Sequence, residues 1–377
     1  MHLNPAPIAP LITKRAFERL LLADVPLLDL RAPSECARGA LPQSLNLPLL
    51  DDDERHQVGL RYKQAGQEAA VALGHRLVSG DVREQRMAAW CKWAAAHPDG
   101  AIYCWRGGQR STIVQQWLAA AGFEMPRIEG GYKALRQHLL QVTDHLAPRL
   151  PLLVLGGRTG TGKTRLLARI DRSLDLEGIA RHRGSAFGSR PGGQPPPAGF
   201  ENELALRLLQ LQRMGPGPIA VEDESRNIGR LSLPEGLIEN LATAPLVLVE
   251  LSLEERVEIT LEDYIVAGLA ERCAHHGDEG FAVFAAWLRD AMHRIRKRLG
   301  GVRHKELMVV LENALAVQAE SGDPGAHRSW ITSLLADYYD PMYDYQLRAK
   351  ADRIIFSGEP AAVMAFLAEQ TSEQAGG

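Results

Sequence analysis

Short apolar runs alternate with helical patterns along the first part of the chain. Residues 25–30 and 101–104 are such runs and predict two buried strands. Residues 83–96 and 111–121 carry apolar side chains at the spacing of one helix face, which predicts a helix before and a helix after the second strand. Because strands that alternate with helices form parallel sheets covered by helices, we expect an α/β domain over residues 1–145.

A second α/β pattern begins after residues 143–151, a proline-containing segment that we interpret as a linker. Strands of this second pattern are predicted at residues 152–155, 219–221, 246–249 and 354–356. Ser252 and Glu255 form a capping-box pattern that starts a helix directly after the third of these strands. We therefore expect a second α/β domain over residues 150–377.

One segment of the second domain has an unusual composition. Residues 183–199 contain five glycines and four prolines. This composition excludes regular structure, so we expect either a mobile lid or a disordered loop there.

Length and composition fit an ordinary enzyme with two or three domains: 377 residues, of which 45% are hydrophobic and 24% charged. The four cysteines form no CxxC pair, which argues against a disulfide framework or a thiolate metal centre, so no protein metal centre is predicted.

No apolar run approaches the ~20 residues that span a bilayer, and prolines interrupt residues 1–15, so neither a membrane segment nor a signal peptide is expected. We expect a cytoplasmic protein, and the net charge of −3 leaves room for a local basic face.

Residues 157–164 match the phosphate-binding pattern GxxxxGK[ST] between a predicted strand and a predicted helix. Glycines at positions 157, 160 and 162 allow backbone angles that turn successive N–H groups toward one point. Lys163 adds a positive charge, and Thr164 can bind a magnesium ion. We therefore predict that Gly157, Gly160, Gly162, Lys163 and Thr164 bind a phosphate or diphosphate. The motif does not indicate which molecule carries it.

Three consecutive acids, Glu222, Asp223 and Glu224, follow the predicted strand at residues 219–221. A carboxylate at that strand end could be the partner of a magnesium ion in the phosphate site. The alternative is a solvated acidic turn.

Cys104 lies between a predicted strand and a predicted helix, in the sequence Cys-Trp-Arg-Gly-Gly-Gln-Arg-Ser. Backbone N–H groups at the helix N-terminus, together with Arg106 and Arg110, favour the thiolate, which is the nucleophilic form. The same loop can hold an oxyanion or a charged chalcogen. The alternative for Cys104 is a buried structural cysteine, and that interpretation is favoured for the other three, which lack such surroundings: Cys36, Cys91 and Cys273.

Two further segments resemble rhodanese domains. Residues 28–48 are similar to their opening signature, and Glu129-Gly-Gly-Tyr132 resembles their closing glycine pair. Rhodaneses carry sulfur on the loop cysteine. Here Cys104 and Arg110 have the C-x5-R spacing of cysteine phosphatases, although Tyr103 stands where classical tyrosine phosphatases have histidine. The length of the loop alone therefore does not separate a phosphatase from a chalcogen transferase.

The combination of YCWRGGQRS, GGxTGxGKT and the sequence at residues 221–226 resembles the tRNA 2-selenouridine synthases, a family in which a rhodanese-like domain precedes a P-loop domain. Residues 54–63 and 73–75 share in this resemblance, which covers nearly the whole chain. The resemblance implies that Cys104 is the catalytic cysteine. It also implies that the sulfur of 2-thiouridine at the tRNA wobble position is replaced by selenium from selenophosphate, with geranylation of that sulfur as an intermediate step.

Under this hypothesis, the P-loop binds the diphosphate of geranyl diphosphate, with Mg²⁺ as a candidate cofactor. Cys104 delivers selenium, and Arg106 and Arg110 stabilise anionic species. The partners are tRNA carrying 2-thiouridine and, as a candidate, an enzyme that supplies selenophosphate. Two alternatives stay open: a sulfurtransferase or cysteine phosphatase fused to a P-loop small-molecule kinase, and a non-enzymatic RNA- or nucleotide-binding protein with an inert rhodanese domain.

RNA contacts are predicted for a cationic run at residues 293–298 together with residues 303–305. A solvated helix face is the alternative. Four tyrosines near the C-terminus could stack on bases, but core packing is the favoured role for Tyr338, Tyr339, Tyr343 and Tyr345.

Overall fold

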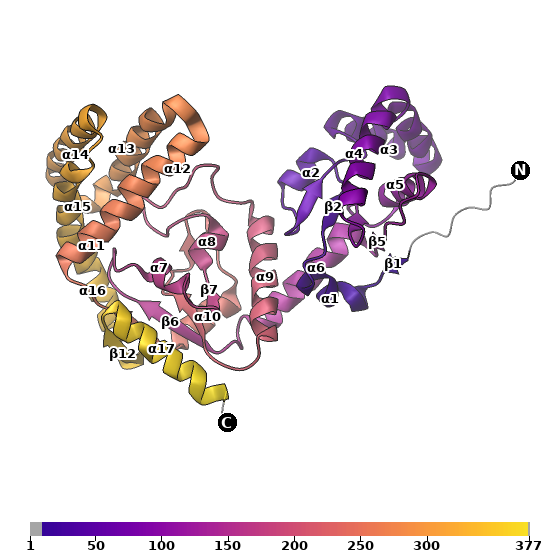
Figure 1. The fold of residues 1–377 in the computed structure, drawn as a ribbon. Coiled ribbons are helices and arrows are strands. Elements are labelled where there is room, and N and C mark those ends of the chain that lie inside the picture. The colour runs from indigo at the N-terminus through magenta and orange to yellow at the C-terminus, as the bar shows by residue number, and fades with distance from the viewer. Residues whose placement is uncertain (1–9, 376–377) are drawn as a thin grey trace, which may run out of the picture. The chain divides into compact units, whose positions relative to one another are not determined.

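Two parallel sheets organise the chain, one in each of two compact units (Figure 1). The structure is a computed structural model that describes residues 10–375. The first unit consists of the chain up to His145 together with Pro196–Gln210, and the second consists of Leu146–Pro195 together with the chain from Leu211. The N-terminal segment that we expect not to be a signal peptide lies largely outside the described residues.

The sheet of the first unit has the strand order β1-β5-β4-β2-β3, and all of its neighbouring strands are parallel. Its strands are β1 (Leu11–Ile12), β2 (Leu27–Asp29), β3 (Ser44–Asn46), β4 (Ala101–Tyr103) and β5 (Arg127–Ile128). The central strands β2 and β4 are buried along their whole length, as expected for a parallel sheet covered on both faces. Both strands predicted in this region are therefore confirmed.

Helices cover both faces of this sheet: η1 (Lys14–Ala16), α1 (Phe17–Leu22), α2 (Pro33–Ala37), α3 (Asp52–Leu77), α4 (Gly80–Ala96), α5 (Gln109–Ala120) and α6 (Gly131–Leu146). Two clusters of buried side chains result. Trp90 and Trp93 belong to one, and Phe17 and Tyr103 belong to the other. The helix α6 continues to Leu146, so the linker predicted at residues 143–151 is shorter than expected. No glycine or proline interrupts the helix before Pro148, which disfavours helical angles at the residue that precedes it.

Helix α9 (Pro197–Arg213) is distant in sequence from the first unit, yet most of it packs there. Arg136 of α6 donates hydrogen bonds to the carbonyl oxygen of Ala198 at 3.2 Å and to the Asn202 side chain at 3.0 Å. Asn202 in turn donates to the carbonyl oxygen of Ala40 at 2.8 Å, and Leu206 lies in the apolar core of the unit. The first unit therefore includes a helix that lies beyond the predicted range of residues 1–145.

The sheet of the second unit has the order β12-β11-β6-β8-β7 and is also parallel throughout. Its strands are β6 (Leu152–Gly156), β7 (Ser173–Leu174), β8 (Ile219–Glu222), β11 (Leu246–Val249) and β12 (Ile354–Gly358). A short antiparallel ribbon, β9 (Asn227–Ile228) with β10 (Leu231–Ser232), lies outside the sheet. The four strands predicted for this unit are confirmed.

The helical segments of the second unit are α7 (Lys163–Leu167), α8 (Leu176–Ala180), α10 (Glu235–Thr243), α11 (Leu253–Thr260), the π-helix η2 (Leu261–Val266), α12 (Ala267–His276), η3 (Gly277–Glu279), α13 (Gly280–Leu299), α14 (Gly301–Ser321), η4 (Gly325–His327), α15 (Arg328–Leu334), the π-helix η5 (Leu335–Tyr339), α16 (Asp340–Arg348), η6 (Ala351–Arg353) and α17 (Pro360–Ala375). The capping box predicted for Ser252 and Glu255 is present at the start of α11. The helices from α11 to α15 share a core of their own, separate from the core that lines the sheet.

The segment at residues 183–199 differs from both expectations, because residues 183–196 are irregular but packed and residues 197–199 already belong to α9. Phe187 is buried in the core of the helical layer and stacks on Trp330, with ring centroids 5.8 Å apart. Arg272 donates to the carbonyl oxygen of Ser189 at 3.0 Å, and Gln194 donates to that of Ile228 at 2.8 Å. One aromatic anchor and side-chain hydrogen bonds thus fix a segment whose composition alone indicates mobility.

Within residues 10–375, no helix is both long and apolar enough to cross a membrane.

Candidate functional site

Cys104 is the first residue after β4, and α5 begins five residues later. The carbonyl oxygen of Cys104 accepts the N–H of Tyr132 at 2.9 Å, and that of Trp105 accepts the N–H of Lys133 at 3.0 Å. These bonds attach the cysteine loop to the start of α6. The side chain of Cys104 is 3% exposed, so the sulfur lies at the base of the loop rather than on the surface.

The glycine pair before α6 leaves room for this loop. Gly131 has a φ of +58°, and a Cβ added there would lie 2.2 Å from the carbonyl oxygen of Cys104 and 2.4 Å from the nitrogen of Gly107. Gly107 is equally constrained, since its Cβ would meet the carbonyl oxygen of Ile128 at 2.6 Å. The closing glycine pair noticed in the sequence is therefore the surface against which the cysteine loop folds.

The sulfur of Cys104 lies 3.3 Å from the hydroxyl oxygen of Ser111, a fully buried side chain on α5. The same hydroxyl lies 3.1 Å from the carbonyl oxygen of Gly108, to which it can donate. Because a serine hydroxyl has one proton, Ser111 donates either to the carbonyl group or to the sulfur. A rotation of this hydroxyl would give an ionised Cys104 a hydrogen-bond donor.

The two loop arginines have different surroundings. The Arg110 guanidinium group forms two hydrogen bonds with the carboxylate of Glu35, at 2.5 Å and 3.2 Å. Burial opposes ionisation of Glu35, but the bonds and charge of Arg110 hold its pKa below the usual value. Arg106 is exposed and has no hydrogen-bond or ion-pair partner among residues 10–375. Arg106 is therefore the loop cation whose donors are available to a ligand.

A buried ion pair positions Glu35. Asp29 and Arg31, both fully buried, bond through Arg31 Nη2 and a carboxylate oxygen at 2.6 Å. Arg31 also donates to the carbonyl oxygens of Glu35 and Gly39, at 3.3 Å and 3.0 Å, and its guanidinium group lies 3.8 Å from the centre of the Tyr132 ring. The opening signature thus fixes the start of α2, from which Glu35 reaches Arg110.

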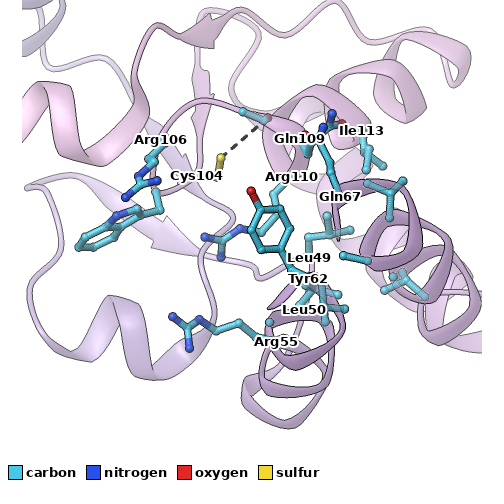
Figure 2. A pocket seen from close by; sticks show the side chains of 18 of the residues that line it. Leu49, Leu50, Arg55, Tyr62, Gln67, Cys104, Arg106, Gln109, Arg110 and Ile113 are labelled. Carbon is cyan, nitrogen blue, oxygen red and sulfur yellow. Dashed lines mark hydrogen bonds between the residues drawn. The ribbon is translucent and has the colours of Figure 1, made fainter. Parts of the chain in front are cut away.

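Cys104, Arg106 and Arg110 line a pocket of about 860 Å³ in the first unit, and Figure 2 shows these side chains around it together with Tyr62. Helices α3 and α5 form much of its wall. Other polar and aromatic lining residues are Arg38, Arg55, His56, Lys63, Gln67, His75, Trp105 and Trp117. Tyr62 and Trp105 are 57% and 36% exposed. The pocket therefore offers aromatic surfaces, several cations and one cysteine sulfur.

The phosphate-binding loop follows β6, as predicted. Gly157, Gly160 and Gly162 all have positive φ, and a Cβ at Gly160 would lie 2.8 Å from the carbonyl oxygen of Arg256. The Lys163 ammonium group donates to the carbonyl oxygen of Gly157 at 2.6 Å and lies 3.3 Å from that of Arg158. Burial lowers the pKa of Lys163. All five predicted phosphate-binding residues thus lie in one loop.

The three acids at the end of β8, of which Glu222 is the last residue of the strand, have three different environments. Glu222 is 2% exposed and accepts the N–H of Leu176, while Asp223 pairs with Lys350 at 2.6 Å. Burial, the charge of Glu177 and a hydrogen bond to it raise the pKa of Glu224 to about 8. A solvated acidic turn is therefore the wrong description of this segment.

Oxygen donors for a magnesium ion are present beside the loop. The Thr164 hydroxyl lies 3.2 Å from the carboxylate of Glu177, and one carboxylate oxygen of the buried Glu222 has no hydrogen-bond partner. Hard oxygen ligands of this kind suit Mg²⁺, which retains several waters. No group of three or more histidine, cysteine or acidic side chains in the described part of the chain is close enough to hold a metal.

A small apolar pocket of about 30 Å³ adjoins the phosphate loop through Thr159. Its other lining residues come from the end of α11, from η2, α15 and η5, and from the packed segment before α9, and they include Phe187, Tyr264, Trp330, Leu334 and Tyr339. An apolar surface therefore borders the predicted diphosphate site.

The cationic run lies at the end of α13 and the start of α14. A hollow of about 460 Å³ is lined there by His293, Arg294, Arg296, Lys297, Gly300 and Gly301. Two of the predicted RNA contacts are less accessible than expected, because Arg303 pairs with Asp337 and His304 is buried. The exposed cations that remain are Arg294, Arg296, Lys297, Arg298 and Lys305.

The four tyrosines near the C-terminus have different surroundings. Tyr338 and Tyr339 pack against the helical core, as favoured from the sequence. Tyr343 contacts the phosphate loop, and Tyr345 is 77% exposed.

Cys36 and Cys91 fit the buried structural role favoured from the sequence, whereas that role is wrong for Cys273, which is exposed. Burial and the neighbouring Asp29 raise the pKa of the Cys36 thiol to about 11. Burial also raises the pKa of Cys91.

These features define a class of protein, a rhodanese-like parallel-sheet domain joined to a P-loop α/β domain, and the predicted fold class is confirmed. Residues 150–374 match the family model described as the tRNA 2-selenouridine synthase AAA domain. The chain is 50% identical to the tRNA 2-selenouridine synthase of Pseudomonas fluorescens over 94% of its length and 98% of that protein. It is 52% identical to the one of Hahella chejuensis, over 94% of each chain. The chain belongs to the tRNA 2-selenouridine synthase family.

Sequence reasoning missed three residues that contact the predicted sites: Glu35, Glu177 and Tyr343. Glu35 lies 75 positions before its partner Arg110, and Tyr343 lies 186 positions after Gly157. The opening signature includes Glu35, and for Tyr343 the sequence indicates only base stacking or core packing, not contact with the phosphate loop.

Proposed function

We propose that this chain replaces the sulfur of 2-thiouridine at the tRNA wobble position with selenium from selenophosphate, through an S-geranyl intermediate made from geranyl diphosphate. Family membership supports a selenium-transferring enzyme of tRNA. The observation that carries the proposal is Cys104 in the wall of a large pocket lined by aromatic and cationic side chains. A pocket of this character suits a splayed nucleobase, which proteins bind by stacking and by contacts to phosphate.

In the first step, the thiouridine sulfur attacks C1 of geranyl diphosphate. A C–S bond forms, the C–O bond to the diphosphate breaks, and the uracil ring releases a proton. The phosphate loop and Lys163 would bind the diphosphate leaving group. Magnesium, held by Thr164 with Glu177 beside it, would neutralise charge on that group. The apolar pocket next to Thr159 would take part of the geranyl chain, and its volume requires side chains to move as the chain enters.

In the second step, water takes the phosphoryl group of selenophosphate as the Se–P bond breaks, and the selenide released adds to C2 of the ring. The C2–S bond then breaks, and geranylthiol leaves with a proton. Cys104 would hold the selenide beside C2 without an S–Se bond, and Arg106 would stabilise the anionic species near it. Arg110 would act through its ion pair with Glu35, which holds the first turn of α5 against α2.

Two substitutions test the division of labour between the sites. Lys163→Ala should abolish geranylation, because the diphosphate loses its direct cationic contact. Cys104→Ala should leave geranylation intact and stop selenation. Cys91→Ala is a matched control, since Cys91 is a part-buried thiol on α4. The readout is mass spectrometry of nucleosides from tRNA treated with each protein, and equal loss of both steps in Cys104→Ala would contradict the proposal.

A further inference from the structure

Every arginine that contacts the phosphate loop or lies within α7 is already paired with a carboxylate. Arg158 forms two hydrogen bonds with Asp344, at 2.9 Å and 2.7 Å, and Arg256 forms two with Asp340, both at 2.7 Å. The third, Arg165, bonds to Asp263 at 3.0 Å and 2.6 Å. The cation of Lys163 differs from these arginines, because its hydrogen bonds go to backbone carbonyl groups of the loop and not to a carboxylate.

Two of the three carboxylates come from one helix, α16. A third side chain of the same helix, Tyr343, accepts the N–H of Gly157 through its hydroxyl group at 2.6 Å. The ammonium group of Lys163 lies 5.8 Å from the centre of the Tyr343 ring. Helix α16 therefore meets the first half of the loop with the phenol of Tyr343 and the carboxylate of Asp344, while its Asp340 pairs with Arg256 of α11.

The guanidinium group of Arg256 is buried between α16 and the phosphate loop. The side chain of Arg256 is 2% exposed, and besides Asp340 it contacts the carbonyl oxygen of Thr159 at 3.3 Å. An arginine in contact with the loop backbone is well placed to bind an additional phosphate group, because guanidinium groups bind phosphate oxygens in pairs. Asp340 occupies both of the terminal nitrogens that would do so.

The far end of α16 is also fixed. Lys350, two residues beyond Arg348, binds both carboxylate oxygens of Asp223 at 2.6 Å and 2.7 Å. Asp223 directly follows β8, the strand next to the one that leads into the phosphate loop. The helix is thus held beside the loop at both ends.

We propose that α16 limits the phosphate loop to two phosphate groups, with Asp340, Tyr343 and Asp344 occupying the donors that a third phosphate would need. The loop offers its backbone and one lysine, which suits a diphosphate ester, whereas a nucleoside triphosphate would meet two carboxylates at the next position. This inference rests on the proposed function for its ligand, geranyl diphosphate, and adds the element that excludes nucleoside triphosphates.

The test is titration calorimetry of the full chain with inorganic pyrophosphate and with inorganic tripolyphosphate, at fixed magnesium concentration. The unaltered protein should bind pyrophosphate at least about tenfold more tightly than tripolyphosphate. Asp344→Asn frees the exposed Arg158 and should strengthen tripolyphosphate binding about tenfold, with a much smaller effect on pyrophosphate, because a charge-assisted hydrogen bond contributes about 1.5 kcal/mol. Tyr343→Phe, which frees the N–H of Gly157 without changing charge, should shift the ratio in the same direction.

The matched control is Glu312→Gln, which makes the same carboxylate-to-amide change in an exposed ion pair between α13 and α14. It should change neither affinity. Equal affinity of the unaltered protein for both probes, or an equal gain for both in Asp344→Asn, would overturn the inference and leave geranyl transfer standing. A protein that binds neither probe would remove both proposals, and loss of geranyl transfer with the selectivity intact would remove only the proposed function.

Discussion

Gly131→Ala should damage the cysteine loop far more than an ordinary glycine substitution does. The φ of +58° costs an alanine about 1–2 kcal/mol by itself. The new methyl group would lie 2.2 Å from the carbonyl oxygen of Cys104, whereas ordinary contact starts at 3.4 Å, so the loop must withdraw by the difference, about 1.2 Å. Overpacking of this kind costs about 1–3 kcal/mol, and the two backbone bonds between the loop and α6 lengthen as well. We expect a loss of about 4 kcal/mol in the free energy of unfolding.

Gly122→Ala is the matched control. Gly122 also has a positive φ, +89°, but a Cβ there meets nothing within 4 Å. Its substitution should cost about 1 kcal/mol, from backbone conformation alone. Urea unfolding followed by circular dichroism measures both losses.

The rate of Cys104 alkylation, in a chain with the other cysteines replaced by serine, reports on the loop itself. This rate should change in Gly131→Ala and stay constant in Gly122→Ala. Equal unfolding free energies and equal alkylation rates for the two variants would refute the packing argument.

Three further predictions concern charge. Glu224, with a pKa of about 8, ionises as the pH rises through that value and adds negative charge near Lys163. Pyrophosphate affinity should therefore fall above pH 8 in the unaltered protein relative to Glu224→Gln, as titration at several pH values would show. Asp29→Asn should cost about 3–5 kcal/mol in thermal or urea unfolding because it leaves Arg31 buried without its counter-charge, and a cost below 1 kcal/mol would contradict this. Arg296→Ala should weaken tRNA binding and reduce its logarithmic salt dependence by about 1, whereas Arg289→Ala, on the same helix but paired with a carboxylate, should leave that slope unchanged.

Local patterns predicted those parts of the molecule that depend on near neighbours in the sequence. The buried strands are continuous apolar runs, and the phosphate loop combines its glycines, lysine and threonine within eight positions, so neither needs tertiary information. The residues that contact these loops from distant parts of the sequence were not predicted. Glu35 and Tyr343 reach the two loops only because the sheets bring distant strand ends together, and no spacing rule connects them to Arg110 or Gly157.

The segment at residues 183–199 shows what a prediction from composition alone leaves out. The exclusion of regular structure holds only up to residue 196, because α9 begins at Pro197, and composition does not report that a single aromatic residue, Phe187, anchors the segment in a core. Burial of one such side chain contributes about 1.5–3 kcal/mol, enough to order a segment without regular hydrogen bonds. The predicted range of the second domain, residues 150–377, includes the residues of α9 for a related reason, since order in the sequence says nothing about which core receives Leu206.

The assignment of α9 also decides how this chain can be divided. The backbone of the chain passes from one unit to the other three times, after His145, after Pro195 and after Gln210. A fragment that stops at residue 145 would lack Asn202 and Leu206. The apolar core side chains that Leu206 covers would then be exposed to water. Proteolysis between the two sheets would thus yield two incomplete units, and each proposed half-reaction is best studied by point substitution in the intact chain.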